Sequence, residues 1–475
     1  MTRRTFLRTG AAIAAGPGIA FPKTSSSVKA SLAIETSHVV AAVPANFTGL
    51  SYESAQLAHP DFFSPSNKRL VAFMRTLGAR GVLRIGGNTS EFTVWSPQGA
   101  SAASGTAGPD TGRKHHGSYP VTSEAIRNLA TFVEAVDWQL IYGLNLGKGT
   151  PEQAAHEAKA VSEAAGSRLL EFQIGNEPDL FHRNGLRPPD WKFSDYFVQW
   201  KQFASAVRKA VPHARFAAPD VAVNVHWIVD FAQQGKDEIA ELTGHYYAEG
   251  PPSNPAMNIE RLLHANPRLD RDIPIIQHAS RESRRPYRMA ETNSCYKGGK
   301  PGVSDTFASA LWGGDYMLQL EQAGFTGINF HGGGEGYYTP IAGSEAKGFS
   351  ARPIYYGMLL AGQFAGTKIV KSTFDAQGVN ATAYAAHTGS GLRVAIFNKD
   401  EQRGMQIHIK SGLHGRLWRL SAPSLHSKTG VTLAGAAVKS DGSWSPVHEE
   451  HAASHHGVVA IHVPAASAVL AFFAA

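Results

Sequence analysis

The chain has 475 residues, of which 43% are hydrophobic and only 17% are charged, together with 48 Gly and 26 Pro. This composition excludes an intrinsically disordered chain and a heptad-based fibrous fold, and the length suits two or three domains. A single cysteine, Cys295, excludes a disulfide framework and a thiolate zinc site. The net charge of +7 is not gathered into a dense basic run, so we expect no nucleic-acid partner.

The first residues are typical of an export signal. Arg3 and Arg4 are followed by Phe-Leu and then by an apolar run of small residues over 10–21. This pattern resembles a twin-arginine signal peptide, which we place at residues 1–28, and it predicts a periplasmic or secreted protein. The alternative is a signal-like start on a cytosolic protein. No later stretch reaches the ~18 uninterrupted apolar residues of a membrane span, so we expect no membrane insertion, and we expect a monomer.

Short apolar runs that end in polar residues alternate with helical stretches through the middle of the chain. Three of the helical stretches, at residues 125–136, 196–207 and 307–323, repeat apolar residues at helical spacing. The eight runs cover residues 47–53, 82–87, 138–145, 169–176, 215–220, 239–247, 287–291 and 326–331. Alternating strands and helices predict a parallel sheet, and eight strands predict a (β/α)8 TIM barrel, which we place at residues 43–365.

After residue 365 the pattern changes to short strands joined by Gly, Ser and His turns. The predicted strands are 367–374, 382–386, 392–397, 406–410, 417–421, 431–438 and 469–473. Such spacing is typical of a β-sandwich, placed at residues 366–475. Residues 29–42 alternate in the same way and are predicted to add an edge strand to that sandwich. The fold class is therefore α/β: a TIM barrel with a C-terminal β-sandwich domain that also takes an N-terminal strand.

Polar residues at the ends of the predicted barrel strands share one rim. In barrel enzymes the catalytic residues lie at this rim, because the loops that follow the strands converge there. The residues are Glu53, Arg84, Asn145, Asn176, Glu177, His245, Tyr247, Glu291 and His331. Each has a structural alternative: Asn145 could cap a helix, and Arg84 could pair with a core carboxylate. Gathered on one rim, they favour an active site.

Two glutamates on this rim suit the hydrolysis of a glycosidic bond. Glu177 ends the fourth predicted strand and Glu291 the seventh, so they face each other across the mouth of the barrel. The reaction needs one carboxylic acid to protonate the leaving oxygen and one carboxylate on the other side of the sugar. When the second carboxylate is the nucleophile and configuration is retained, the two lie about 5–5.5 Å apart.

Asn176-Glu177-Pro178 on the fourth strand, with Glu291 on the seventh, resembles the retaining barrel glycosidases. Within that clan the chain resembles the heparanases and bacterial β-glucuronidases of glycoside hydrolase family 79. The matching stretches are residues 83–87, 142–145, 174–178, 244–247, 291–296 with 298–299, and 304–307. The resemblance implies that Glu177 is the general acid/base and Glu291 the nucleophile. We expect no cofactor and no metal.

The surroundings of the two glutamates agree with that division. Arg84 and the hydroxyl of Tyr247 are expected to stabilise a charged Glu291, whereas Glu177, without a matched cation, is expected to stay protonated. The resemblance further implies that Asn176 bonds the 2-hydroxyl of the sugar, and we expect His245 to orient these residues.

The resemblance also implies a site for the carboxylate of a uronic acid. The matching positions are Tyr296, Gly298, Gly336 and Tyr338, and Lys297 stands where the heparanase pattern has a further glycine. Backbone N–H groups and tyrosine hydroxyls can bind such a carboxylate, and Lys297 could add a positive charge. Glu53 and Asn88 are expected either to contact sugar hydroxyls or only to hydrogen-bond within the rim.

Three functions follow from these residues. The first is a retaining exo-β-glucuronidase that removes terminal glucuronic acid from a glycan or glucuronide through a glycosyl-enzyme intermediate. The second keeps the mechanism but cleaves within acidic polysaccharides, as the heparanases do. The third, of another class, is a barrel that binds glycans without cleaving them, and the complete set of Glu177, Glu291 and Arg84 argues against it.

Overall fold

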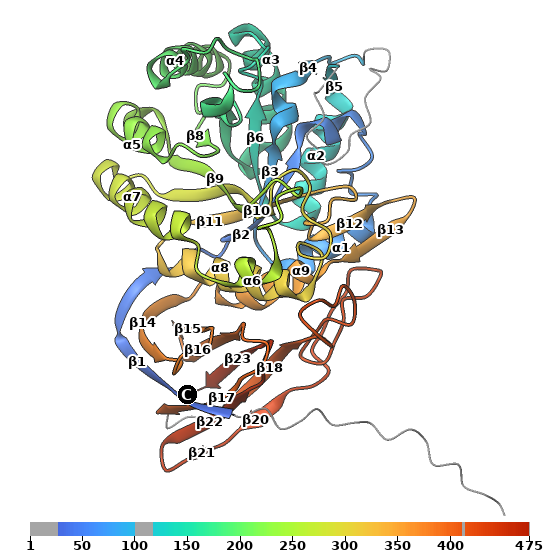
Figure 1. Cartoon of the computed structure of the whole chain (residues 1–475). Coiled ribbons are helices and arrows are strands. Elements are labelled where there is room, and N and C mark those ends of the chain that lie inside the picture. The colour runs from blue at the N-terminus through green and yellow to red at the C-terminus, as the bar shows by residue number, and fades with distance from the viewer. Residues whose placement is uncertain (1–26, 100–116, 411–413, 475) are drawn as a thin grey trace, which may run out of the picture.

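The computed structural model describes residues 27–99, 117–410 and 414–474. A barrel wrapped in helices forms the upper part of the molecule, and a β-sheet domain lies below it (Figure 1). The predicted signal peptide lies outside the described residues, except for the last two of its 28 positions, so export stays a prediction. None of the helices within the described ranges combines the length and apolar character that a membrane span requires.

Eight parallel strands close the barrel in the order β10-β11-β2-β3-β6-β7-β8-β9. They are β2 (Thr48–Glu53), β3 (Val82–Gly86), β6 (Gln139–Leu144), β7 (Leu169–Ile174), β8 (Phe216–Val221), β9 (Glu241–Glu249), β10 (Tyr287–Cys295) and β11 (Gly327–Gly332). Each corresponds to one of the eight predicted runs, and the predicted fold class is confirmed. Strand β10 is longer than predicted, because it continues past Glu291 to Cys295.

The α-helices are α1 (Lys68–Leu77), α2 (Ser123–Val136), α3 (Pro151–Ala165), α4 (Phe193–Ala210), α5 (Val225–Gln234), α6 (Ile259–Leu263), α7 (Pro267–Ser283), α8 (Phe307–Gln322) and α9 (Pro353–Ala361). Helix α2 illustrates why they form where they do. The hydroxyl of Thr122 caps its first turn by accepting from Ala125 N–H, and its buried face includes Ile126, Leu129 and Val133.

Short two-stranded ribbons and 3-10 turns lie between the main strands and helices. Two ribbons pair β4 (Thr93–Trp95) with β5 (Tyr119–Val121) and β12 (Ile341–Ser344) with β13 (Gly348–Ala351). The 3-10 turns are η1 (Ser54–Ala58), η2 (Asn88–Phe92), η3 (Gly166–Arg168), η4 (Pro178–Leu180), η5 (Lys236–Glu238) and η6 (Gly362–Phe364). The turns η1, η2 and η4 directly follow β2, β3 and β7, so they shape the rim where the strands end.

The second domain is a continuous sheet that folds over its own apolar core. Its strands are β1 (Ser27–Ala42), β14 (Lys368–Asp375), β15 (Ala381–Thr388), β16 (Gly391–Asn398), β17 (Gly404–Lys410), β18 (Gly415–Ser421), β19 (Thr432–Leu433), β20 (Glu450–Ala452), β21 (Ser454–His455), β22 (Val458–Val463) and β23 (Ser467–Ala474). The N-terminal strand is present, as predicted. It is not an edge strand, however, because β1 pairs antiparallel with β14 on one side and parallel with β17 on the other.

The predicted strand at residues 431–438 is wrong beyond its first residues. Only Thr432–Leu433 is extended. Ala434 and Gly435 adopt left-handed conformations, with φ of 49° and 72°, and turn the chain away from the sheet. Apolar residues in this stretch instead pack into the larger core, which Val431, Leu433 and Ala434 join.

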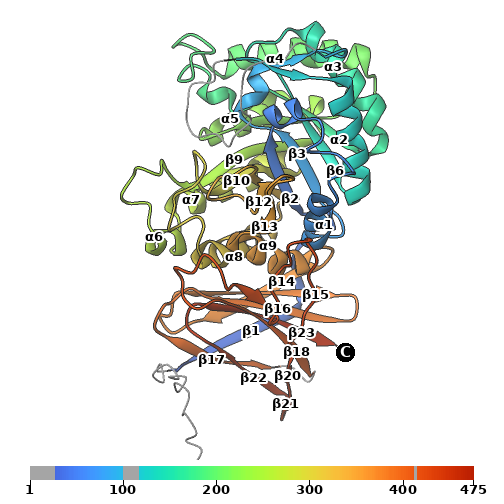
Figure 2. The same ribbon diagram turned by 90° about the vertical axis from the view of Figure 1, so that its right-hand side faces the viewer.

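Helices α8 and α9 lie between the barrel strands and the second domain (Figure 2). Asp315 on α8 accepts hydrogen bonds of 2.6 and 2.7 Å from the hydroxyls of Thr382 and Tyr384 on β15. The Lys399 ammonium also pairs with Asp315. One carboxylate on a barrel helix therefore connects to three side chains of the β domain.

Candidate active site

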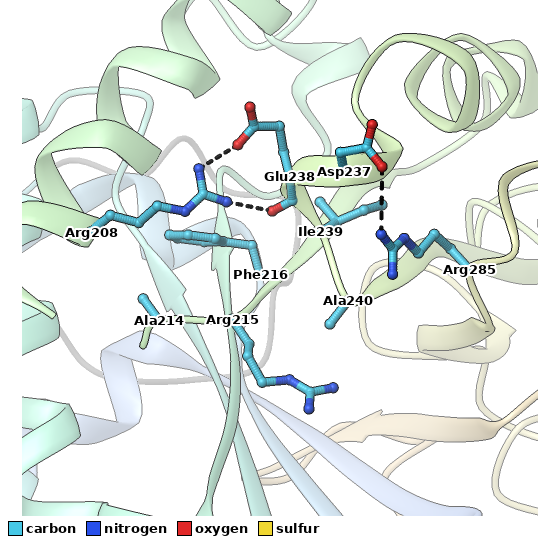
Figure 3. Close-up of a pocket in the computed structure, with 9 residues that line it drawn as sticks. All are labelled: Arg208, Ala214, Arg215, Phe216, Asp237, Glu238, Ile239, Ala240 and Arg285. Atoms are coloured by element: carbon cyan, nitrogen blue, oxygen red, sulfur yellow. Dashed lines mark hydrogen bonds and ion pairs between the residues drawn. The ribbon is translucent and has the colours of Figure 1, made fainter. Parts of the chain in front are cut away.

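The two ends of the barrel differ in chemistry. Where the strands begin, a hollow of about 410 Å³ is lined by residues that flank β8 and β9 (Figure 3). Its arginines are paired: Arg208 with Glu238 and Arg285 with Asp237. None of the predicted site residues lines this hollow. They lie instead where the barrel strands end.

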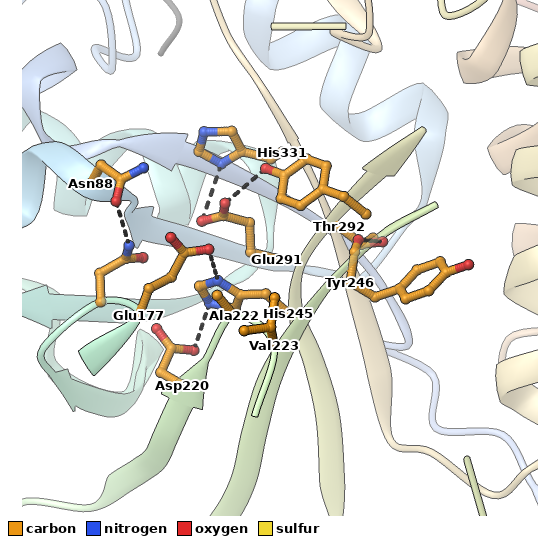
Figure 4. Close-up of polar contacts among 12 residues, drawn as sticks. Asn88, Glu177, Asp220, Ala222, Val223, His245, Tyr246, Glu291, Thr292 and His331 are labelled. Atoms are coloured by element: carbon orange, nitrogen blue, oxygen red, sulfur yellow. Dashed lines mark hydrogen bonds and ion pairs between the residues drawn. The ribbon is translucent and has the colours of Figure 1, made fainter. Parts of the chain in front are cut away.

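Glu177 and Glu291 are brought together at that end, as predicted. Glu177 follows β7 and Glu291 lies on β10, and one carboxylate oxygen of each lies within 4.8 Å of the other (Figure 4). Both are buried, with 8% and 4% of their surface exposed. A substrate that reaches one of these carboxylates therefore also reaches the other.

Glu291 is surrounded by groups that favour its charged form. Its Oε2 accepts a 2.7 Å hydrogen bond from Nη1 of Arg84, and its Oε1 accepts one of 2.7 Å from the Tyr247 hydroxyl. Nδ1 of His331 lies 3.6 Å from Oε2. Burial alone would raise the pKa of Glu291, but His331, His245 and Arg84 together hold its pKa well below the usual range. Glu291 is therefore an ionised carboxylate.

The Arg84 side chain, which is 1% exposed, is fully bonded. Nε donates to Gln173, Nη1 to Ser51 and Glu291, and Nη2 to Asn176 and Asp220, at 2.7–3.0 Å. A guanidinium has five N–H groups, so each of them has a partner here. The planar fork therefore fixes five side chains, which lie on or directly after the four strands β2, β7, β8 and β10, in one arrangement.

Glu177 has a different environment. Burial raises the pKa of its carboxyl to about 7, against a lowering influence from His245. We predicted no matched cation beside Glu177, and this was wrong: His245 Nδ1 lies 3.1 Å from its Oε1. Burial disfavours the charge on His245, but Asp220 and Glu291 outweigh it and raise the pKa of His245 to about 10. Glu177 nevertheless holds a proton far more readily than Glu291.

The turn that carries Asn176 and Glu177 is held from below by Glu91 on η2. Glu91 Oε1 accepts from the backbone N–H of Asn176 at 2.6 Å. The Asn176 side chain is fixed between Arg84 and Asn88, whose Oδ1 accepts from its Nδ2 at 3.4 Å. Asn176 thus points its amide along the rim, beside the predicted acid.

Glu53 and Asn88 both lie at the rim, as predicted. Glu53 Oε2 accepts from the backbone and hydroxyl of Thr89, at 2.8 and 2.5 Å, and Oε1 lies 3.5 Å from Nε2 of His331. Glu53 is 7% exposed and its carboxylate already has protein partners. The rim-bonding role is therefore visible, and a contact with sugar hydroxyls stays a prediction.

Three tyrosines gather beside Glu291. The ring centroid of Tyr247 is 6.3 Å from that of Tyr296 and 6.2 Å from that of Tyr338. Tyr338 is 1% exposed and Tyr296 38%, so the cluster runs from the buried site to the surface. Together with Tyr247, these positions combine apolar ring faces with polar hydroxyls, a combination that suits a sugar.

The loops after β10 and β11 join next to these rings. The carbonyl of Gly298 accepts from the backbone N–H groups of Tyr337, at 2.7 Å, and Tyr338, at 3.4 Å. Gly336 is buried in the same junction, whereas Lys297 is exposed and has a left-handed backbone with φ of 62°. The structure therefore brings Tyr296, Gly298, Gly336 and Tyr338 together, while Lys297 faces solvent.

One group of side chains has the spacing of a metal site. Among the described residues, Glu177, His245 and Glu291 each place one atom within 4.8 Å of the others. Their chemistry does not fit a metal ion, because His245 is held as a cation and Glu291 is bonded to Arg84.

Some functional neighbours were missed from the sequence. Asp220, Gln173 and Glu91 are buried; Asp220 and Gln173 accept from Arg84, and Glu91 accepts from the backbone N–H of Asn176. Asp220 ends the fifth predicted strand, so the rule that identified the other rim residues could have found it. Cys295 is buried and burial raises the pKa of its thiol to about 12, which excludes a nucleophilic thiolate.

Comparison with known proteins gives the following matches. Residues 383–470 match a family model described as the glycosyl hydrolase family 79 C-terminal beta domain. A β-glucuronidase of Aspergillus niger is 26% identical over 413 residues, which are 79% of this chain and 74% of that protein. A β-glucuronidase of Neurospora crassa is 27% identical, over 66% of this chain and 63% of its own length. A heparanase of Gallus gallus is 23% identical, over 55% of this chain and 51% of its own.

Solved structures show the same fold at low identity. A 4-O-α-L-rhamnosyl-β-D-glucuronidase of Fusarium oxysporum superimposes with a TM-score of 0.75 and 18% identity, over 93% of this chain and 99% of that one. A GH51 arabinofuranosidase of Xanthomonas axonopodis gives a TM-score of 0.71 and 14% identity, over 94% and 100%. The family model and the curated relatives confirm the resemblance to glycoside hydrolase family 79 that the motifs indicated.

Proposed function

We propose that this chain, a protein of the glycoside hydrolase family 79 type, is a retaining exo-β-glucuronidase. The observation that carries the proposal is the pair Glu177 and Glu291, which lie within 4.8 Å of each other and differ in protonation. An inverting enzyme needs about 6.5–9.5 Å between its carboxyl groups to admit a water molecule, whereas retention needs about 5–5.5 Å. The short separation supports retention.

In the first step, the carboxylate of Glu291 attacks the anomeric carbon of the sugar. The bond from that carbon to the glycosidic oxygen breaks, and the carboxylic acid of Glu177 gives its proton to the leaving oxygen. The products are a free alcohol and a sugar esterified to Glu291. The ionised state of Glu291, held by Arg84 and Tyr247, supplies the nucleophile.

In the second step, Glu177 is a carboxylate and removes a proton from water. The oxygen of this water attacks the anomeric carbon, the ester bond to Glu291 breaks, and both glutamates return to their first states. One water molecule is consumed for each bond cleaved. His245, a cation 3.1 Å from Glu177, stabilises the carboxylate that exists between the two steps.

The preference for a uronic acid is supported by the curated β-glucuronidases and by the loop junction after β10 and β11. Tyr296, Gly298, Gly336 and Tyr338 are together in the structure and could enclose the C5 carboxylate of the sugar. Asn176 bonds the 2-hydroxyl in this proposal, where such bonds strengthen in the transition state, and its bond from Arg84 at the rim supports this role.

A heparanase-like endo-β-glucuronidase is the second candidate, because heparanases match over about half of this chain. Digestion of an acidic oligosaccharide separates the two. Glucuronic acid and a chain shorter by that one sugar as the early products indicate exo action, and internal fragments indicate endo action.

The decisive experiment uses an aryl β-glucuronide and the variant Glu291→Ala. The wild-type protein should release the phenol and form the β-anomer first, seen by NMR, and the variant should lose activity by at least about 10³-fold. A panel of aryl glycosides of other sugars reports the specificity. Full activity in the variant would refute the assignment of Glu291. A wild-type protein that binds but cleaves no uronide would favour the glycan-binding barrel.

We also propose that the protein is exported through its twin-arginine-type N-terminus. Fractionation of cells that express the chain, compared with an Arg3→Lys/Arg4→Lys variant, tests this. The variant should accumulate in the cytoplasm, and equal distribution of the two would contradict export by this route.

A further inference from the structure

Asp220 connects the two glutamates. We propose that Asp220 is a positioning residue of the reaction, which holds the His245 ring against Glu177 and the Arg84 guanidinium against Glu291. This inference rests on the proposed function, since it concerns the same pair of carboxylates, and it adds a residue to which neither the motifs nor the matched relatives assigned a role.

The side chain of Asp220 contacts both partners directly. Its Oδ1 lies 3.0 Å from Nε2 of His245, and its Oδ2 accepts a 2.7 Å hydrogen bond from Nη2 of Arg84. Gln173 Nε2 donates to Oδ1 at 2.6 Å. Asp220 is 1% exposed, so water does not screen these contacts. One buried anion therefore contacts both His245 and Arg84.

The backbone of Asp220 also holds Glu177. The carbonyl oxygen of Asp220 accepts from the N–H of Glu177 at 3.0 Å. Both residues have left-handed backbones, with φ of 62° and 53°, a conformation that costs free energy and persists where surrounding contacts enforce it. The backbone carbonyl of Asp220 thus fixes the position of Glu177, and its side chain sets the proton affinity of Glu177 through His245.

The two carboxyl groups that flank the ring favour the cationic form of His245. Nε2 faces the Asp220 carboxylate and Nδ1 faces the Glu177 carboxyl at 3.1 Å. A neutral imidazole has only one N–H, whereas the cation donates from both nitrogens. With Asp220 in place, the ring is a cation that can bond the carboxylate of Glu177 after its proton has left.

Removal of the charge of Asp220 should therefore act on Glu177 through His245. Without that anion the ring loses its second proton, and Glu177 loses a cation at 3.1 Å. The loss of the His245 charge raises the pKa of Glu177, and the loss of the Asp220 charge lowers it. The first effect is larger, because His245 is nearer to Glu177 and Coulomb energy falls with distance. The substitution leaves in place the other charged or titratable groups that face Glu177, His245 and Asp220. They are Arg84 on β3, Asp179 after β7, Tyr196 on α4, Tyr247 on β9, Tyr287 and Glu291 on β10, and His331 on β11.

The first test is the pH dependence of kcat/KM in Asp220→Asn. The alkaline limb, which reports the deprotonation of Glu177, should move to higher pH by about 1 unit. The rate at the optimum should fall by about 10²-fold as Glu177 and Arg84 lose their alignment. An alkaline limb that stays in place or moves to lower pH would overturn the proposal.

Asp179→Asn is the matched control. Asp179 is a second buried carboxylate near Glu177, but its oxygens accept from the backbone N–H groups of Ala222, Val223 and Asn224. Its negative charge raises the pKa of Glu177, so its removal should move the alkaline limb to lower pH, opposite to Asp220→Asn. Equal shifts in the two variants would mean that any buried carboxylate acts alike, and would overturn the role of Asp220.

A second measurement needs neither turnover nor a variant of Asp220. In wild-type protein with ¹⁵N-labelled histidine, the His245 signal is identified by its absence in His245→Gln. Both ring nitrogens should be protonated at pH 7, and one unprotonated nitrogen would overturn the proposal. If the protein cleaves no uronide, the proposed function fails while this measurement still tests the contact of Asp220 with His245.

Discussion

Two glutamates of one site are given opposite protonation states by their neighbours. Glu291 contacts Arg84 and the Tyr247 hydroxyl directly, and these contacts stabilise its charge in spite of burial. Within the described part of the chain, Glu177 has only His245 as a close cation, and that cation is shared with Asp220. Burial therefore dominates at Glu177 and raises its pKa to about 7. The difference between acid and nucleophile arises from partners, not from residue type.

This difference predicts the pH profile of the wild-type enzyme. Activity requires Glu177 protonated and Glu291 ionised. The rate should fall as pH rises through about 7, where Glu177 loses its proton. On the acid side it should persist to a pH below the usual range of a glutamate, because the pKa of Glu291 is lowered. The measurement is kcat/KM of an aryl β-glucuronide against pH.

The variant Glu177→Gln identifies the group responsible. For substrates with a poor leaving group the rate should fall by about 10²–10⁴-fold, and the limb near pH 7 should disappear. For substrates with an activated phenol the loss should be smaller, because such a leaving group needs no proton. A limb that persists unchanged in this variant would show that another group titrates there.

At the scale of elements, two of the site residues lie where the register of the barrel sheet shifts. The ladder between β9 and β10 shifts register between Met289 and Glu291, and the ladder between β8 and β9 shifts between Pro219 and Val221. Glu291 lies at the first shift and Asp220 inside the second. A bulge re-aims a side chain at the end of a strand. Without these shifts, strict alternation would set the direction of both carboxylates.

The contact between α8 and α9 depends on glycine. A Cβ atom at Gly357 on α9 would lie 2.0 Å from the carbonyl oxygen of Ala310 on α8. Gly357→Ala should therefore force the helices apart and lower the free energy of unfolding by about 1–3 kcal/mol, measured by urea denaturation. Gly389→Ala is the control, because a Cβ there meets nothing within 4 Å, and it should change stability little. Equal effects would contradict close helix packing as the cause.

At the scale of the whole molecule, the chain crosses between its two domains more than once. Strand β1 enters the sheet between β14 and β17 before the barrel begins. Helix α8 then bonds to that sheet through Asp315. The first strand and the last strands share one sheet. In the sequence, therefore, segments of the β domain both precede and follow the barrel. The β domain contacts the barrel through α8 and α9, away from Glu177 and Glu291.

The Asp315 contact predicts a stability effect. Asp315→Ala leaves the Lys399 ammonium, which is 9% exposed, without its carboxylate and removes an acceptor from two hydroxyls. The free energy of unfolding should fall by about 3 kcal/mol in urea, as when one partner of a buried pair is lost. Glu163→Ala removes a partner of an exposed pair with Lys159 and should change little. A similar small change in both variants would refute the coupling through Asp315.

The sequence by itself determined the barrel, the second β domain and the pair of glutamates. Hydrophobic runs mark the strands locally, and the polar residue after each run marks the functional rim, so Glu177 and Glu291 could be placed without coordinates. Resemblance then assigned their roles and suggested the loop residues Tyr296 and Tyr338. All of these inferences depend on residues that are close in sequence or on motifs, and both can be recognised in a single sequence.

Only the tertiary structure decided which charges meet. Three contacts join segments that are far apart in sequence: His245 with Glu177, Asp220 with His245 and Arg84, and β1 with its neighbours inside the sheet. The strand predicted at residues 431–438 was wrong for the same reason. Its apolar residues pack in the larger core and do not form a strand ladder, which only the tertiary structure shows. Closure of the barrel brings these residues into contact, and the distances between them determine the protonation of the two glutamates. Electrostatic energy depends on separation and burial, and the order of residues in the sequence gives neither.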